Sequence, residues 1–143
     1  MLKLILNKKY NPLFSSEARY FIITGGRGSG KSFAVTVFLT LLTMTKGIRI
    51  LFTRYTMTSA HLSIIPEFLE KIGLLGFDDV FSINKAEVVN TSNQSDILFR
   101  GIKTSAGNQT GNLKSLQGIS TWVLDEAEEL VDENIFDTID LSI

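Results

Sequence analysis

The sequence predicts one α/β domain with a mainly parallel central sheet flanked by helices. Short apolar runs rich in β-branched residues, typical of buried strands, alternate along the chain with longer segments of helical periodicity. This alternation favours a parallel sheet, because each helix returns the chain to the end of the sheet at which the next strand starts. The chain has 143 residues, 44% of them hydrophobic and 20% charged, which is enough for one domain with a hydrophobic core.

The first half of the chain holds two predicted strands and two predicted helices. Residues 20–24 are a short apolar run that ends at glycines, which predicts a buried strand, and residues 25–30 form a loop. Residues 31–45 show a helical pattern, and their apolar stripe consists of Phe33, Val37, Leu41 and either Met44 or Thr45. Residues 48–53 predict a second buried strand, and residues 58–73 predict a helix interrupted near its proline.

The second half predicts three further strands. Glu87–Asn90 and Ile97–Ile102 are short apolar runs joined by a polar turn. Residues 103–118 are rich in Gly, Ser, Asn and Lys, which predicts a loop. Thr121–Leu124 is a short buried strand, and a helix is predicted from about Glu126.

Charge is divided unevenly along the chain, although the net charge is only −1. All 14 Lys and Arg lie in residues 1–114 with 7 acids, whereas residues 115–143 hold 8 acids and no base. This division fits a DNA-facing surface beside a metal-binding segment, and it fits solvated helix faces equally well. The absence of cysteine excludes disulfides and thiolate metal sites and fits a reducing cytoplasm, and no apolar run is long enough to span a membrane.

A glycine-rich loop provides the strongest chemical signal. It matches the phosphate-loop pattern G-x-x-x-x-G-K-[ST] with Gly25, Gly26, Arg27, Gly28, Ser29, Gly30, Lys31 and Ser32. The glycines let backbone N–H groups curl around phosphate oxygens, and the following helix adds its N-terminal partial charge. Lys31 is expected to reach the β- and γ-phosphates of ATP, and Ser32 to bind Mg²⁺ through its hydroxyl. Arg27 either folds onto the γ-phosphate or points into solvent.

A pair of carboxylates provides the second signal. Asp125 and Glu126 directly follow the predicted strand Thr121–Leu124, as in a Walker B element. Asp125 is expected to hold the magnesium shell and Glu126 to act as general base on the attacking water. The alternative is an acidic helix start, because a helix dipole stabilises carboxylates there in any case. An Asp-Glu pair favours an ATPase over a nucleotide kinase, whose acceptor is not water.

Together the motifs resemble the N-terminal ATPase domain of the large subunit of tailed-phage terminases, in the branch found in many prophages of Gram-positive bacteria. The resemblance covers essentially the whole chain and implies a P-loop NTPase fold. The stretches that carry it, besides the glycine-rich loop, are Arg19–Ile23, Ile50–Arg54, Asp96–Lys103 with Lys114-Ser115, and Thr121–Leu130.

The resemblance implies a motor that uses ATP and Mg²⁺ to pump phage DNA through the portal into an empty capsid. Its implied partners are double-stranded DNA, the portal protein, the small terminase subunit and further copies in a ring, in the cytoplasm of an infected or lysogenic bacterium. It makes Arg27 a γ-phosphate sensor, Asp125 the magnesium carboxylate and Glu126 the catalytic base. Arg100 is the first candidate for an arginine finger acting on a neighbouring subunit and Arg54 the second, the alternative for each being an ordinary salt bridge. It places adenine contacts near residues 10–13 and Arg19.

The chain departs from this family beyond the carboxylate pair. It stops at Ile143, and neither the coupling motif nor the C-terminal nuclease domain is visible. We therefore expect residues 1–143 to be a P-loop ATPase domain that binds nucleotide, hydrolyses it poorly alone and neither packages nor cuts DNA. Two alternatives stay open, namely another nucleic-acid-dependent ATPase of helicase or recombinase type and an ATP-binding switch module with little turnover.

Overall fold

The computed structural model describes residues 4–57, 60–104, 107–108, 113 and 116–143. Lys114-Ser115 and most of the predicted loop 103–118 lie outside these residues. The elements in chain order are η1 (Lys8–Tyr10), α1 (Pro12–Ser15), α2 (Lys31–Leu42), β1 (Arg49–Thr56), α3 (Ala60–Leu75), η2 (Asp78–Val80), β2 (Phe81–Ile83), β3 (Glu87–Asn90), β4 (Asp96–Thr104), β5 (Gly107–Asn108), β6 (Thr121–Leu124), η3 (Ala127–Glu129) and α5 (Glu133–Asp140).

One sheet organises these elements, in the order β2-β3-β4-β1-β6, with β5 paired to β4. β1 lies at its centre and pairs in parallel with both β4 and β6. The pairs β2–β3, β3–β4 and β4–β5 are antiparallel. The sheet is therefore mixed rather than mainly parallel, because a tight turn, and not a helix, joins β3 to β4.

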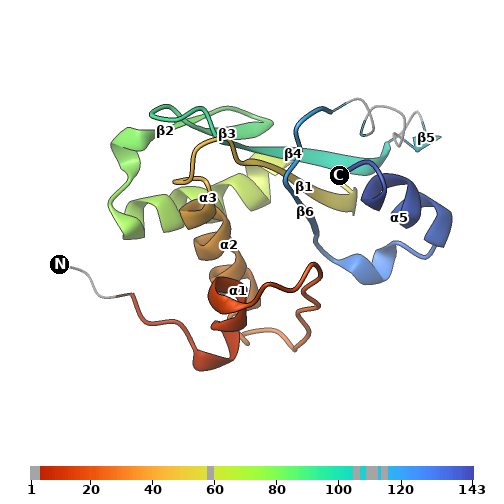
Figure 1. Ribbon diagram of the computed structural model, residues 1–143, viewed down its shortest axis with the longest axis horizontal. Helices are drawn as coiled ribbons and strands as arrows, with labels where there is room; N and C mark the ends of the chain where they lie inside the picture. Colours follow the sequence, from red (N-terminus) through yellow and green to blue (C-terminus); the bar gives the residue numbers. More distant parts are fainter. Residues whose placement is uncertain (1–3, 58–59, 105–106, 109–112, 114–115) are drawn as a thin grey trace.

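Two clusters of buried apolar side chains lie on opposite faces of the sheet. Successive residues of β1 point to opposite faces, so Ile50 and Phe52 belong to the first cluster and Leu51 to the second. The first cluster includes residues of α2 and α3, namely Leu39, Ile64, Ile65, Phe68 and Ile72. The second includes Ile135 and Ile139 of α5. In Figure 1 α2 and α3 lie together, and α5 lies apart from them near the C-terminus. We call the face of the sheet that carries the first cluster the α2 face, and the face that carries the second cluster the α5 face.

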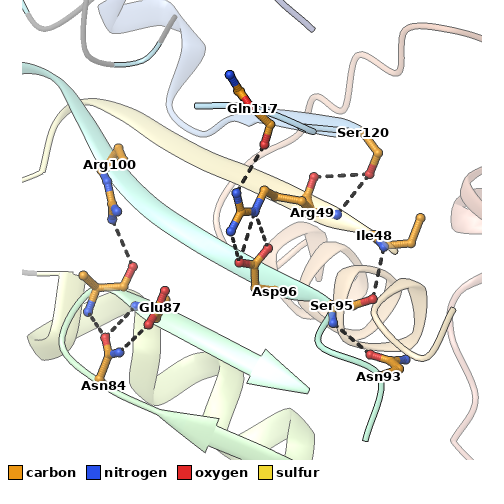
Figure 2. A network of polar contacts seen from close by, with 11 residues as sticks. Ile48, Arg49, Asn84, Glu87, Asn93, Ser95, Asp96, Arg100, Gln117 and Ser120 are labelled. Carbon is orange, nitrogen blue, oxygen red and sulfur yellow. Dashed lines mark hydrogen bonds and ion pairs between the residues drawn. The ribbon is translucent and has the colours of Figure 1, made fainter. Parts of the chain in front are cut away.

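An ion pair fixes the register of the two central strands. Arg49 and Asp96 are partners in the β1–β4 ladder. The Arg49 Nη2 and Nε atoms lie 3.0 and 3.1 Å from the two carboxylate oxygens of Asp96, as Figure 2 shows. Hydrogen bonding to Asp96 is the main cause that raises the pKa of Arg49 above its ordinary value. The pair ties the start of β1 to the start of β4.

The predicted strand over residues 20–24 is wrong. No strand forms there, and Ile22 is 91% exposed. β4 and β6 occupy both sides of β1, and the Tyr20 hydroxyl and Arg19 guanidinium bind Asp140 of α5 instead. The apolar composition of the segment signals a strand, but composition does not supply the neighbouring strand that a ladder needs.

The helices also differ from their predictions. α3 runs unbroken through Pro66, and the carbonyl that this proline leaves without a helical donor belongs to Leu62, a residue that is 72% exposed. The helix expected from about Glu126 begins only at Glu133, after the short η3. α2 ends at Leu42, and Leu41 on its predicted apolar stripe is exposed. No helix in the described ranges is long and apolar enough to cross a membrane.

Candidate functional site

The glycine-rich loop, residues 25–32, curls directly into the start of α2. Gly25, Gly28 and Gly30 have φ values of +146°, +74° and +79°, a region that residues with a Cβ atom rarely adopt. Gly30 caps α2 in the left-handed conformation, and its carbonyl accepts from Ala34 N at 3.0 Å. The first N–H groups of α2 have no partner within the helix, so this end of α2 favours an anion.

Lys31 is folded onto its own loop. Its Nζ donates to the carbonyl oxygen of Gly25, to that of Gly26 at 3.1 Å and to Ser29 Oγ at 3.4 Å. A Cβ atom added at Gly25 would lie 3.2 Å from the same Ser29 hydroxyl oxygen, a tight contact at a position where the φ of +146° also disfavours a side chain. The Lys31 ammonium group is therefore held by three oxygen atoms of its own loop.

Tyr10 supports the loop from outside the motif, a contact that the sequence did not predict. It is 6% exposed, and its hydroxyl donates to Ser29 O at 2.8 Å. A Cβ atom added at Gly30 would lie 3.9 Å from the Tyr10 ring. Of the segment expected near adenine, Tyr10 therefore lies beside the loop, whereas Arg19 is held 3.4 Å from Asp140.

Arg27 and Ser32 have exposed side chains in the loop. Neither forms a side-chain hydrogen bond or an ion pair with any residue that the structure describes. Both side chains are therefore available to a ligand at the loop.

The carboxylate pair, Asp125 and Glu126, lies at the carboxyl end of β6 beside β1. Asp125 N donates to Thr53 O at 2.8 Å, which extends the β1–β6 ladder by one residue. Arg54, the next residue of β1, places Nη2 at 2.7 Å and Nε at 2.8 Å from Asp125 Oδ2. The same Nε lies 3.7 Å from Glu126 Oε2.

Glu126 has an unusual backbone conformation. Its φ of 53° and ψ of 49° place it in the left-handed region, which costs a residue with a Cβ atom roughly 1 kcal/mol or more. Its carbonyl accepts from Glu129 N at 3.0 Å in η3. The turn directs the chain away from β6 directly after Asp125 and leaves the Glu126 side chain 48% exposed.

Strand alternation places these groups on one face of the sheet. Arg54 continues the series Ile50 and Phe52, and Asp125 continues from Val123, which packs against the same cluster. Arg54 and Asp125 therefore lie on the α2 face, the face covered by the helix that starts at the glycine-rich loop. Among the described residues, however, no hydrogen bond or ion pair joins that loop to the carboxylate pair.

Arg100 lies on the opposite, α5 face. It is the register partner of Thr53 and alternates with Phe99, whose ring belongs to the first cluster. Its Nη1 donates to Phe99 O at 2.8 Å and to Ala86 O at 3.3 Å, the second contact being drawn in Figure 2. The structure therefore separates Arg100 from the carboxylate pair and brings Arg54 to it.

The other end of α2 is anchored to the turn between β3 and β4. Asn90 Nδ2 donates to Thr43 O at 3.1 Å, and Asn93 Nδ2 donates to the Thr43 and Met44 carbonyls at 3.0 and 3.1 Å. Ser95 Oγ donates to Thr45 O at 2.7 Å. These bonds satisfy the carbonyls of the three residues that directly follow α2. The polar turn in the sequence was a signal for a loop, but not for its contact with α2.

The residues present fit a magnesium ion held together with a nucleotide. Ser32 offers a hydroxyl and Asp125 a carboxylate, and hard oxygen ligands of this kind suit Mg²⁺, which usually takes few protein ligands beside substrate phosphates. In the described parts of the chain there is no group of three or more His, Cys, Asp or Glu side chains that would hold a metal ion alone.

Comparison with known proteins relates the chain to one family of phage proteins. The family model described as phage terminase large subunit matches residues 17–143. The chain is also similar to the large terminase subunit of Bacillus phage SPP1, with 24% identity over 150 residues that cover 94% of this chain and 34% of that protein. It thus spans about a third of the length of that relative. Because the family match covers most of the sequence, the chain belongs to the phage terminase large subunit family.

Proposed function

We propose that residues 1–143 are the ATP-hydrolysing motor domain of a phage DNA-packaging terminase, with a P-loop NTPase fold. The main support is the glycine-rich loop, in which three glycines with positive φ lead into α2 and Lys31 is folded onto the loop. The position of Asp125 on the α2 face is the second support. The family match links this nucleotide chemistry to DNA packaging.

Each residue of the proposed site has a role in hydrolysis. Backbone N–H groups of residues 25–32 and the start of α2 bind phosphate oxygens, and Lys31 contacts the β- and γ-phosphates. Ser32 and Asp125 would hold a Mg²⁺ ion that arrives with the nucleotide, and this ion would supply positive charge to the transferred phosphoryl group. Glu126 accepts a proton from the attacking water, and Arg27 stabilises charge on the γ-phosphate.

The proposed partners follow from a packaging role. They are double-stranded DNA, the portal protein, the small terminase subunit and further copies of the large subunit in a ring, in the cytoplasm of the bacterial host. Arg100 remains the proposed finger toward a neighbouring subunit. In this proposal the domain works within a longer subunit that also contains coupling and nuclease segments.

Two substitutions separate nucleotide binding from hydrolysis. Lys31→Ala should abolish ATP binding, because it removes the cation that contacts the β- and γ-phosphates. Glu126→Gln should keep binding and lower turnover about 10²–10⁴-fold, since it removes the general base and leaves the loop unchanged. Binding is measured by calorimetry on this chain, and turnover by phosphate release from the intact subunit with double-stranded DNA.

Glu128→Gln is the matched control, because Glu128 is an exposed glutamate two residues beyond Glu126. It should leave binding and turnover unchanged. Normal turnover of Glu126→Gln would show that another group is the base. Binding without turnover in the unsubstituted subunit would favour the ATP-binding switch module over a motor.

A further inference from the structure

The ion pair between Arg54 and the carboxylate pair bears on how the site handles its metal. Arg54 places two nitrogens on the same oxygen, Asp125 Oδ2, at 2.7 and 2.8 Å. No described residue donates a hydrogen bond to the other oxygen, Oδ1. The guanidinium therefore tethers the carboxylate by one oxygen and leaves the second without a hydrogen bond from any described residue.

The surrounding structure makes this tether firm. The backbone of Asp125 is bound to Thr53 O, and Thr53 Oγ1 in turn donates to Val123 O at 3.0 Å. Trp122 Nε1 donates to the same Thr53 hydroxyl oxygen at 2.8 Å. The Arg54 side chain is only 27% exposed, so its charge is partly shielded from water. A partly buried, charge-assisted pair on such a fixed frame is stronger than an ordinary surface salt bridge.

The charges of Arg54, Asp125 and Glu126 sum to one negative charge in the absence of a bound cation. One guanidinium faces two carboxylates, because Arg54 Nε also lies 3.7 Å from Glu126 Oε2. A divalent cation at Asp125 gains the attraction of both carboxylates and meets the repulsion of Arg54 at close range. Arg54 therefore weakens the hold of Asp125 on a metal while it keeps the carboxylate in place.

We propose that Arg54 is a positioning residue of its own subunit that limits the affinity of the site for Mg²⁺-ADP and so speeds product release. This inference rests on the proposed function, in which Asp125 belongs to the magnesium site. It also argues against Arg54 as a finger for a neighbouring subunit, because its guanidinium is already bound to carboxylates of its own domain.

The test measures ADP affinity by calorimetry over a series of free Mg²⁺ concentrations. Arg54→Gln removes the charge and keeps a shorter polar side chain, so it should lower the half-saturating Mg²⁺ concentration about threefold to tenfold. Dissociation of Mg²⁺-ADP, followed by stopped flow, should slow by a similar factor. Arg54→Lys keeps the charge and should stay within about twofold of the unsubstituted chain.

Lys103→Gln is the matched control for the loss of one positive charge. Lys103 is the register partner of Thr56 on the neighbouring strand, and it contacts the Tyr55 ring rather than a described carboxylate. It should not change the magnesium dependence. Arg54→Gln with unchanged or weaker Mg²⁺ dependence, or with a shift equal to that of Lys103→Gln, would overturn the inference.

The experiment distinguishes this inference from the proposed function. If the unsubstituted chain binds no ADP at any Mg²⁺ concentration, the proposed function fails. If it binds ADP with Mg²⁺ and Arg54→Gln has no effect, only the role of Arg54 fails. If Arg54→Gln does not fold, as judged by circular dichroism, the comparison of Arg54→Lys with Lys103→Gln decides. Arg54→Lys weakening Mg²⁺-ADP binding more than about threefold would then contradict a role based on charge.

Discussion

The pKa of Tyr20, an exposed residue, is changed by a contact with a residue far away in the sequence. Its hydroxyl donates to Asp140 Oδ2 at 2.8 Å, and this hydrogen bond is the main cause that raises the pKa of Tyr20 above its ordinary value of 10.0. A raised pKa means that folding favours the neutral phenol. This contribution to stability is therefore fully present below pH 10.0 and is lost as the pH rises through the higher pKa of the folded state.

Asp140→Asn should move the pKa of Tyr20 down toward its ordinary value, because the phenol loses its charged acceptor. The measurement is an ultraviolet titration of tyrosine ionisation, with Tyr20→Phe identifying the signal among the three tyrosines. Asp137→Asn serves as control, since Asp137 is the smallest of the causes that act on Tyr20. Equal shifts in the two variants would contradict the assignment to the hydrogen bond.

At the scale of single residues, the sequence predicts the roles of residues that lie within one motif better than contacts between distant segments. The spacing from Gly25 to Ser32 predicted the loop, and its three positive φ values fit the pattern. Tyr10 and Arg54 were not predicted in their observed contacts, because each contact joins segments far apart in the chain. Arg54 lies at the end of a strand that becomes the neighbour of Asp125 only through the sheet order. The position of Arg54 at the end of a predicted strand marked it as a candidate functional residue, but did not identify Asp125 as its partner.

At the scale of the elements, the hydrogen bonds between the β3–β4 turn and the end of α2 bear most on the site, because α2 starts at the glycine-rich loop. Asn90 is fully buried, donates to Thr43 O and accepts from the Ser92 backbone and side chain at 2.9 and 2.6 Å. Asn90→Ala should lower the free energy of unfolding by about 1–3 kcal/mol, because it leaves buried polar groups without partners. Urea unfolding measures this change.

Thr91→Ala provides the control for Asn90→Ala, because Thr91 is exposed in the same turn and its hydroxyl bonds only Val80 O, at 2.9 Å. It should cost less than Asn90→Ala. Equal losses of stability in the two variants would mean that the buried asparagine does not anchor the helix. A loss of stability confined to Asn90→Ala would instead tie the position of α2 to the β3–β4 turn.

Element types were easier to predict than element ends or pairings. Strands were confirmed at Ile48–Thr53, Glu87–Asn90, Ile97–Ile102 and Thr121–Leu124, because each has an apolar sequence. Thr121–Leu124 was predicted to be buried, but it is half-buried, because it lies at the end of the sheet. Residues 20–24 have the same composition and form no strand, since pairing depends on the rest of the sheet. β2 was missed, because it has only three residues and lies at the edge of the sheet.

At the scale of the whole molecule, the two parts of the proposed site are carried by elements on the same face of the sheet. α2 carries the glycine-rich loop and packs on the α2 face, and β1 and β6 present Arg54 and Asp125 on that face. Alternation along the sequence predicted an α/β domain, but not the mixed sheet, whose hairpin β3–β4 replaces a crossover. In the proposed function this site forms only in the folded domain, so nucleotide binding and folding should be coupled.

This coupling predicts different thermal unfolding for Lys31→Ala, which alters the glycine-rich loop, and Asn90→Ala, which removes the anchor of α2. A ligand that binds only the folded state at 100 times its Kd adds about 2.7 kcal/mol to the free energy of unfolding, or roughly 5–10 °C in Tm at this chain length. Mg²⁺-ADP should therefore raise the Tm of the unsubstituted chain by that amount. Lys31→Ala should keep a Tm near the original value without ligand and lose the increase, because Lys31 is half-buried and bonds mainly to its own loop.

Asn90→Ala should show the opposite result in the same thermal unfolding assay. Its Tm without ligand should fall, because the anchor of α2 is lost, whereas an increase should persist at ligand concentrations scaled to its own Kd. The size of the increase depends on the ratio of ligand concentration to Kd and not on the starting stability. A full increase in Lys31→Ala would show that the ligand binds away from the glycine-rich loop. No increase in Asn90→Ala at saturating ligand would show that the anchor of α2 is needed for the binding conformation itself.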